Sequence, residues 1–167
     1  MDFYEVIRTR RSIREYQERP VEEDKLQRIL EAARLAPSAA NRQPWQFLVI
    51  KTEKIKKEFQ RAYNKDWFWQ APVIICACGI KKEAWIRSDG KSYLDVDVAI
   101  AMDHLVLAAT AEGLGTCWIG AFNPSEVKKI LNLPDDIEPV ALTPLGYPAT
   151  SPKPTHRKPL GKIVKRI

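Results

Sequence analysis

The sequence has few of the residues on which membrane insertion, secretion and metal binding depend. It contains three cysteines and two histidines, and its longest uncharged apolar run, Ala71 to Ile80, has ten residues. A helix needs roughly 20 apolar residues to span a bilayer, so a transmembrane segment is excluded. Residues 1–16 mix acidic side chains with arginines and contain no apolar core, so no targeting peptide is visible. We therefore expect a cytoplasmic protein without a membrane partner.

The scarce cysteines, histidines and glycines also lack the spacing of familiar chemical motifs. Cys76 and Cys78 have no second pair, which argues against a zinc site or a disulfide framework. His104 lacks the second histidine of a helical metal site. Gly113 and Gly115 end a helical pattern and lack the third glycine of a dinucleotide fingerprint. Without metal ligands or an evident acid–base pair, a bound organic cofactor is the economical source of chemistry.

Acidic residues are absent after Glu138, and the whole net charge of +6 lies beyond that position. Such cationic segments are commonly solvated surface. Alternatively, two distant segments converge on an anion such as a phosphate. Nucleic acid is a third possibility, but no nucleic-acid-binding motif is present and the main body is neutral. The two cationic clusters are Arg8, Arg10, Arg11, Arg14 and Arg19, and Lys153, Arg157, Lys158, Lys162, Lys165 and Arg166.

Capping residues and hydrophobic spacing indicate that helices and strands alternate along one domain, residues 1–167. Asp2 and Glu5 form a capping box for a helix that we expect to bury Phe3, Val6 and Ile7. The interleaved pattern indicates an α/β or α+β fold around one sheet. We expect further helices over about 22–36 and 95–112, one capped by Thr52 and one beginning at Asn123-Pro124, and strands over 45–51, 72–79, 116–120 and 139–146.

Several short segments, in the correct order along nearly the whole chain, resemble the signatures of the FMN-dependent nitroreductase family. Each segment alone is weak, whereas their joint order is specific. They are Arg10 to Tyr16 (RRSIREY), Ala36 to Trp45 (APSAANRQPW), Ala71 to Val73, Asp97 to Gly120 (ending GLGTCWIG), Gly146 to Pro148 and Arg157 to Leu160.

The resemblance implies an α+β, nitroreductase-like fold of three α/β/α layers, with a mixed central sheet flanked by helices. It also implies a homodimer with FMN in the subunit interface and a C-terminal tail that is domain-swapped onto the partner. Arg10, Arg11, Ser12 and Arg157 would hold the FMN phosphate, and Arg14 would reach the flavin N1/O2 edge. The other implied cofactor contacts are Pro37, Ser38, Ala39 and Asn41 from the other subunit, and Ile119, Gly120 and Ala121 against the ring.

Two parts of the chain fit the family pattern less well. Residues 80–94 form a shorter segment than the insertion with which larger members cover the flavin. The family also has an FMN contact in mid-chain, but the sequence does not show whether Asn64 or Lys65 would make it. The aromatic residues Trp67, Phe68, Trp69 and Trp85 either form a wall over the flavin or pack in the core.

The activity implied by the resemblance is that of an NAD(P)H oxidoreductase. Hydride would pass by a ping-pong cycle through flavin N5 to a nitroaromatic, a quinone or a similar electron-poor small molecule. No catalytic side chain, metal or nucleic-acid partner is expected. The alternatives are reductive dehalogenation or flavin fragmentation on the same fold, and a non-catalytic flavin- or nucleic-acid-binding module.

Overall fold

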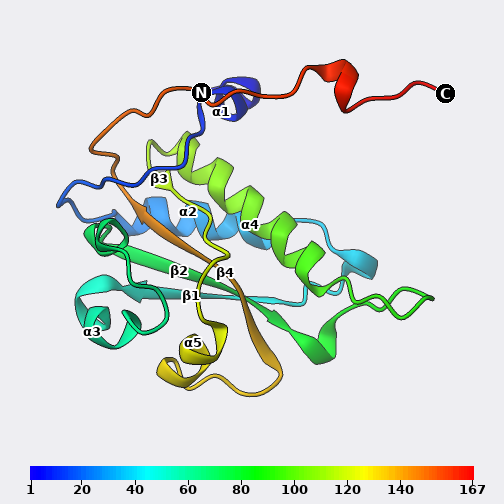
Figure 1. Cartoon of the computed structure of the whole chain (residues 1–167), viewed down its shortest axis with the longest axis horizontal. Helices are drawn as coiled ribbons and strands as arrows, with labels where there is room; N and C mark the ends of the chain where they lie inside the picture. Colours follow the sequence, from blue (N-terminus) through cyan, green and yellow to red (C-terminus); the bar gives the residue numbers. More distant parts are fainter.

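Four strands form a central sheet in the order β1-β2-β4-β3 in the computed structural model, which describes residues 1–167 (Figure 1). Each pair of neighbouring strands is antiparallel. In chain order the elements are α1 (Phe3–Thr9), α2 (Glu23–Arg34), η1 (Ala39–Asn41), β1 (Trp45–Lys51), η2 (Thr52–Lys54), α3 (Lys56–Phe59), η3 (Asp66–Gln70), β2 (Val73–Ile80), η4 (Lys81–Glu83), α4 (Leu94–Ala111), β3 (Gly115–Thr116), α5 (Pro124–Ile130), β4 (Ile137–Gly146) and η5 (Leu160–Lys162).

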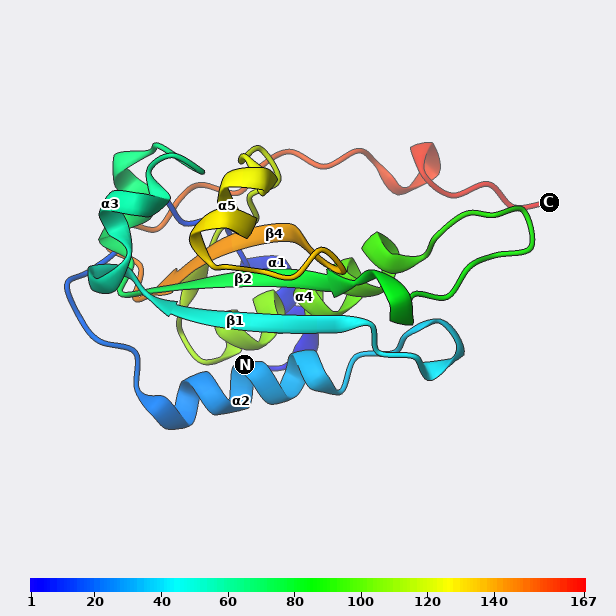
Figure 2. The same ribbon diagram turned by 90° about the horizontal axis from the view of Figure 1, so that it is seen from below.

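Helices cover both faces of the sheet, so the expected three α/β/α layers are confirmed (Figure 2). α2 and α4 pack on one face, where Ile29, Met102 and Leu105 are fully buried. α3 and α5 lie on the other face, where Phe59 and Val127 are fully buried. β2 is buried along nearly its whole length because its alternate side chains enter these two cores.

The sequence prediction agrees within two residues with the observed bounds of β1, β2, β4, α2 and α4. α4 begins at Leu94 and ends at Ala111, and α5 is capped by Asn123, whose side chain accepts a hydrogen bond from the Glu126 N–H at 3.2 Å. No helix of the structure combines the length and the apolar character that crossing a membrane requires.

Instead of the expected mixed sheet, parallel pairing is reduced to one isolated bridge between Ser12 and Thr116. The expected strand over residues 116–120 is also shorter. Of this segment only Thr116, at the end of β3, pairs regularly with β4, because the Cys117 N–H donates to the Thr143 hydroxyl at 3.1 Å. Pairing with β4 resumes at an isolated bridge from Ile119 to Leu142.

Two short helices near the surface differ from expectation. Asp2 caps α1 as predicted, but Val6 is the one side chain of the helix that is buried, while Phe3 is 63% and Ile7 47% exposed. Thr52 does not cap a helix, because its hydroxyl donates to the Ala71 carbonyl at 2.6 Å. The chain there forms the η2 turn and the single turn of α3.

The segment 10–16 approaches β3 closely because Gly115 has no side chain. A Cβ at Gly115 would lie 2.6 Å from Cγ1 and 2.9 Å from Cβ of Ile13, which is itself buried. The β-branched Ile13 has little rotamer freedom with which to move aside.

We therefore expect Gly115→Ala to destabilise the protein by about 1–3 kcal/mol, the usual cost of overpacking. Urea unfolding at neutral pH measures this change. Gly161→Ala is the matched control, because a Cβ there would meet no atom within 4 Å. Equal stability of the two variants would contradict the close approach.

A hydrogen bond between side chains connects the residue before α2, Glu22, to Tyr147, the residue after β4. The Tyr147 hydroxyl donates to Oε2 of Glu22 at 2.6 Å, and the Arg19 guanidinium lies 3.8 Å from the centre of the Tyr147 ring. The hydrogen bond from Tyr147, with smaller contributions from the backbone and Arg19, lowers the pKa of Glu22 to about 2.

A carboxyl whose pKa is lower in the folded than in the unfolded chain stabilises the fold above its unfolded pKa. The contribution of Glu22 is therefore complete above about pH 4.5 and disappears as the pH falls towards 2. We expect the unfolding free energy of the wild type to fall more steeply over this range than that of Glu22→Gln. Urea unfolding at several pH values compares the slopes, and parallel slopes would refute the prediction.

Candidate cofactor-binding site

Cationic side chains from both ends of the chain line one hollow of about 390 Å³. It contains all five residues that the resemblance places near the FMN phosphate and the N1/O2 edge. No acidic side chain lines it. Its lining residues are Arg10, Arg11, Ser12, Arg14, Pro152, Lys153, Thr155 and Arg157.

The N-terminal half of this hollow is held by the free edge of β3. The Ile13 N–H donates to the Thr116 carbonyl at 2.9 Å, next to the bridge made by Ser12. The Tyr16 hydroxyl donates to the Ile13 carbonyl at 2.8 Å. Burial raises the pKa of the Tyr16 phenol, so the hydroxyl remains a donor at every working pH.

None of the cations in the hollow pairs with a carboxylate; the ion pairs of the protein lie elsewhere. Arg11 donates to the Arg8 and Arg10 carbonyls at 2.7 Å each. Arg14 lies over the Trp67 ring, 5.8 Å from its centre. Guanidinium, ammonium and hydroxyl donors without a competing acid fit a phosphate, which can accept several of them at once.

Cys117 lies at the same edge of the sheet and was not identified from the sequence as part of this region. Burial raises the pKa of its thiol, against an opposing effect of Arg14. A neutral, 4% exposed thiol is not a nucleophile. The region therefore offers binding groups and no reactive side chain.

The segment 119–121 follows β3 along this edge and presents an open backbone. Both backbone groups of Ile119 pair with β4: its N–H donates to the Leu142 carbonyl at 2.9 Å, and its carbonyl accepts from the Leu142 N–H at 3.0 Å. Gly120 and Ala121 are exposed, and their N–H groups form no backbone hydrogen bond. A Cβ at Gly120 would meet nothing within 4 Å, so a flat group has room to approach.

The remaining predicted contacts lie at the other end of the molecule. Pro37 to Asn41 precede β1 beside the start of α4, whereas the segment 10–16 runs along β3 near the C-terminal end of β4, at the opposite end of the sheet (Figures 1 and 2). One chain therefore does not bring Pro37, Ser38, Ala39 and Asn41 to the arginine hollow. This separation is consistent with their expected contribution from a second subunit.

The structure separates the aromatic candidates. Phe68 and Trp69 are buried in the core and Trp85 packs against Tyr93 at 4.9 Å. Trp67 is half-buried under Arg14 and is the one that faces the cationic segment.

Asn64 and Lys65 lie just before η3 and line no part of the arginine hollow. Lys153 and Thr155 were missed, although their place in the cationic tail beside Arg157 was the available signal.

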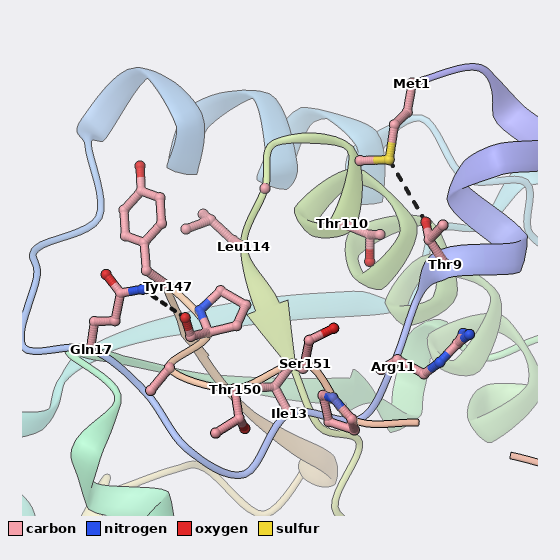
Figure 3. A pocket seen from close by; sticks show the side chains of 14 residues that line it. Met1, Thr9, Arg11, Ile13, Gln17, Thr110, Leu114, Tyr147, Thr150 and Ser151 are labelled. Carbon is pink, nitrogen blue, oxygen red and sulfur yellow. Dashed lines mark hydrogen bonds between the residues drawn. The ribbon is translucent and has the colours of Figure 1, made fainter. Parts of the chain in front are cut away.

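A second hollow, of about 560 Å³, lies between α1, the end of α4 and the chain that leaves β4 (Figure 3). The Gln17 amide donates to the Pro148 carbonyl at 2.7 Å on one side of it. Arg11, which also lines the first hollow, is its sole charged side chain. It is larger than the arginine hollow but has no comparable set of hydrogen-bond donors.

Known proteins with similar sequences and structures carry related names. A crystal structure of a nitroreductase family protein from Clostridium difficile superposes with a TM-score of 0.91 at 37% identity, covering 99% of this chain and 98% of that one. An NADH dehydrogenase of Thermus thermophilus is 32% identical over 93% of this chain and 91% of its own length. An FMN reductase [NAD(P)H] of Bacillus subtilis is 33% identical over 83% of this chain and 63% of its own length. An iodotyrosine deiodinase of Thermotoga neapolitana is 27% identical over 98% of this chain and 96% of its own length.

The sequence model of one family covers most of the chain. The model described as "Nitroreductase family" matches residues 7–64 and 58–147, a span that includes the N-terminal arginines, the loop before β1, α4 and β4. The fold, the order of the motifs and these matches agree, and the chain belongs to the nitroreductase family.

Proposed function

We propose that the protein is a homodimeric, FMN-dependent NAD(P)H oxidoreductase that reduces nitroaromatic, quinone or similar electron-poor acceptors. The observation that carries this proposal is the acid-free hollow in which Arg10, Arg14 and Arg157 lie without carboxylate partners. FMN, when bound, would supply hydride transfer through N5, from NAD(P)H and then to the acceptor in a ping-pong cycle. The protein supplies binding, orientation and charge.

The residues of the hollow would divide between the two ends of the cofactor. Arg10, Ser12 and Arg157 would donate to the phosphate, and Arg11 and Lys153 add positive charge around it. Arg14, which lies over the Trp67 ring, would place a permanent positive charge at the flavin N1/O2 edge. A cation there favours electron uptake by the ring because it stabilises the added negative charge.

The open edge formed by Gly120 and Ala121 would face the flavin ring. Their unpaired N–H groups can donate towards N5, while Ile119 packs below. No side chain is required as an acid, because solvent can supply the proton. The specificity for the acceptor then depends on the walls around the ring.

Completion of the site requires a second copy of the chain, which would contribute Pro37, Ser38, Ala39 and Asn41. The face of α4 that carries Val96, Ile100 and Leu107 is only partly covered, and Val96 is 39% exposed. The tail after β4 is extended, and its apolar side chains Leu160 and Ile163 are 71% and 66% exposed. Both features support an interface in which the tail lies on the partner.

The spectrum of the purified protein tests this proposal. We expect one tightly bound FMN per subunit, a dimer in sedimentation, bleaching of the yellow colour by NADPH or NADH without oxygen, and its recovery on adding a quinone. A colourless monomer under saturating FMN would overturn it. Turnover of halophenols with the same reductants would instead favour reductive dehalogenation, and loss of the flavin itself would favour flavin fragmentation.

Removing one guanidinium from the hollow should weaken cofactor binding. We expect Arg10→Ala to raise the Kd for FMN about 10- to 100-fold, because a hydrogen bond to a charged group contributes about 1.5–3 kcal/mol. Quenching of flavin fluorescence measures this Kd.

Arg34→Ala is the control for Arg10→Ala. Arg34 is also a surface arginine, but it pairs with Glu31 on α2, outside the hollow. Equal FMN affinity of both variants would contradict the assignment. If Arg10→Ala instead weakened binding to a DNA duplex and left FMN binding intact, the basic segment would serve nucleic acid.

A further inference from the structure

The loop between α2 and β1 holds an unusual backbone conformation. Ala40, Asn41 and Gln43 all have positive φ angles, of 51°, 53° and 51°. Side-chain-bearing residues adopt this left-handed region rarely and at a cost, so a loop with three of them persists only where its surroundings hold it. Such strain is found mainly at functional sites.

Several hydrogen bonds hold this loop, and a distant buried side chain accepts one of them. The Gln43 N–H donates to the Ser38 hydroxyl at 2.8 Å within the loop, and Arg42 donates to the Ala84 carbonyl at 3.2 Å. The Ala39 N–H donates to Oδ1 of Asp97 at 2.9 Å. Asp97 belongs to the first turn of α4 and is 1% exposed, so this bond fixes the loop to a rigid helix.

The second oxygen of Asp97 shows that the carboxyl is costly for the fold. Oδ2 is buried and has no hydrogen-bond partner. A buried polar atom without a partner opposes folding. Asp95, two residues earlier on the same helix, is exposed and carries no such cost. A buried carboxyl that leaves one oxygen without a partner while it holds a strained loop is typical of a functional constraint.

We propose that Asp97 is a positioning residue, whose hydrogen bond to the Ala39 N–H sets the loop from Pro37 to Asn41 in the conformation that receives the flavin held by the other subunit. This inference rests on the proposed FMN-binding dimer. The loop is placed before any cofactor arrives, so binding does not have to order it. Loss of the bond should therefore weaken FMN binding more than it weakens the fold.

The first test compares Asp97→Ala, Asp97→Asn and the control Asp95→Ala by their Kd for FMN and by the melting temperature of the FMN-free dimer. An asparagine keeps an oxygen that can accept from the Ala39 N–H. We expect Asp97→Ala to raise the Kd at least tenfold, while Asp97→Asn and Asp95→Ala stay within about threefold of the wild type. The melting temperatures show which variants are folded.

A second variant removes the donor and leaves α4 intact. Ala39→Pro lacks the N–H, and proline is tolerated at the first position of a helical turn after an extended residue such as Ser38. If the hydrogen bond is the cause, the effects of Ala39→Pro and Asp97→Ala on the Kd will not multiply in the double variant. If Asp97→Ala folds poorly, the Kd of Ala39→Pro alone carries the test, and a Kd within about threefold of the wild type would then overturn the role.

The outcomes separate this inference from the proposed function. If the wild type binds FMN as a dimer but Asp97→Ala binds it equally well, the positioning role is wrong and the function stands. Multiplying effects in the double variant, or no rescue by Asp97→Asn, would likewise overturn the role. If the wild type takes up no FMN, both proposals fail together.

Discussion

The backbone contact between the segment 10–16 and the edge of β3 is the constraint on which the candidate site depends. It places Arg10, Arg11 and Arg14 beside one another although like charges repel. For two charges roughly 4 Å apart such repulsion is about 1 kcal/mol in bulk water and about 4 kcal/mol near a protein surface, and salt screens it. Burial of one isoleucine contributes about 1.5–3 kcal/mol, so Ile13, 5% exposed against Gly115, offsets part of this repulsion and helps to hold the segment in place.

The same contact connects the arginines to the segment that would face the flavin ring. Thr116 pairs with Ser12 and begins the run that continues to Ala121 along the edge of the sheet. An extended chain covers at most about 3.6 Å per residue, so Gly120 lies within about 14 Å of Thr116. A cationic end and an open, flat end thus occupy one edge, and a phosphate-bearing planar cofactor combines the same two chemistries.

Much of the fold could be predicted from the sequence because the long elements have strong patterns. The continuous apolar character of β2 and the helical spacing of Leu26, Ile29 and Ala33 both reflect burial in the cores. Features decided by tertiary contacts could not be predicted. Thr52 bonds to a carbonyl 19 residues away instead of capping a helix. The charge distribution along the sequence shows the arginine clusters, and the family motif assigns roles to their members. Asp97 resembled any acidic residue in a first helical turn, and only the folded structure shows that it is buried and accepts a hydrogen bond from Ala39.

α4 connects the two halves of the proposed site. Its apolar residues surround most of its circumference, a pattern of helices that are covered on every side. Within one chain the sheet and α2 cover two sides, and Val96 stays 39% exposed. In the proposed dimer a second copy would cover this face. Asp97 follows Val96 directly and holds the loop that the other subunit's cofactor would meet. In the proposed dimer a shift of α4 therefore moves the interface and the loop together, so assembly of the dimer and completion of both sites are one structural event.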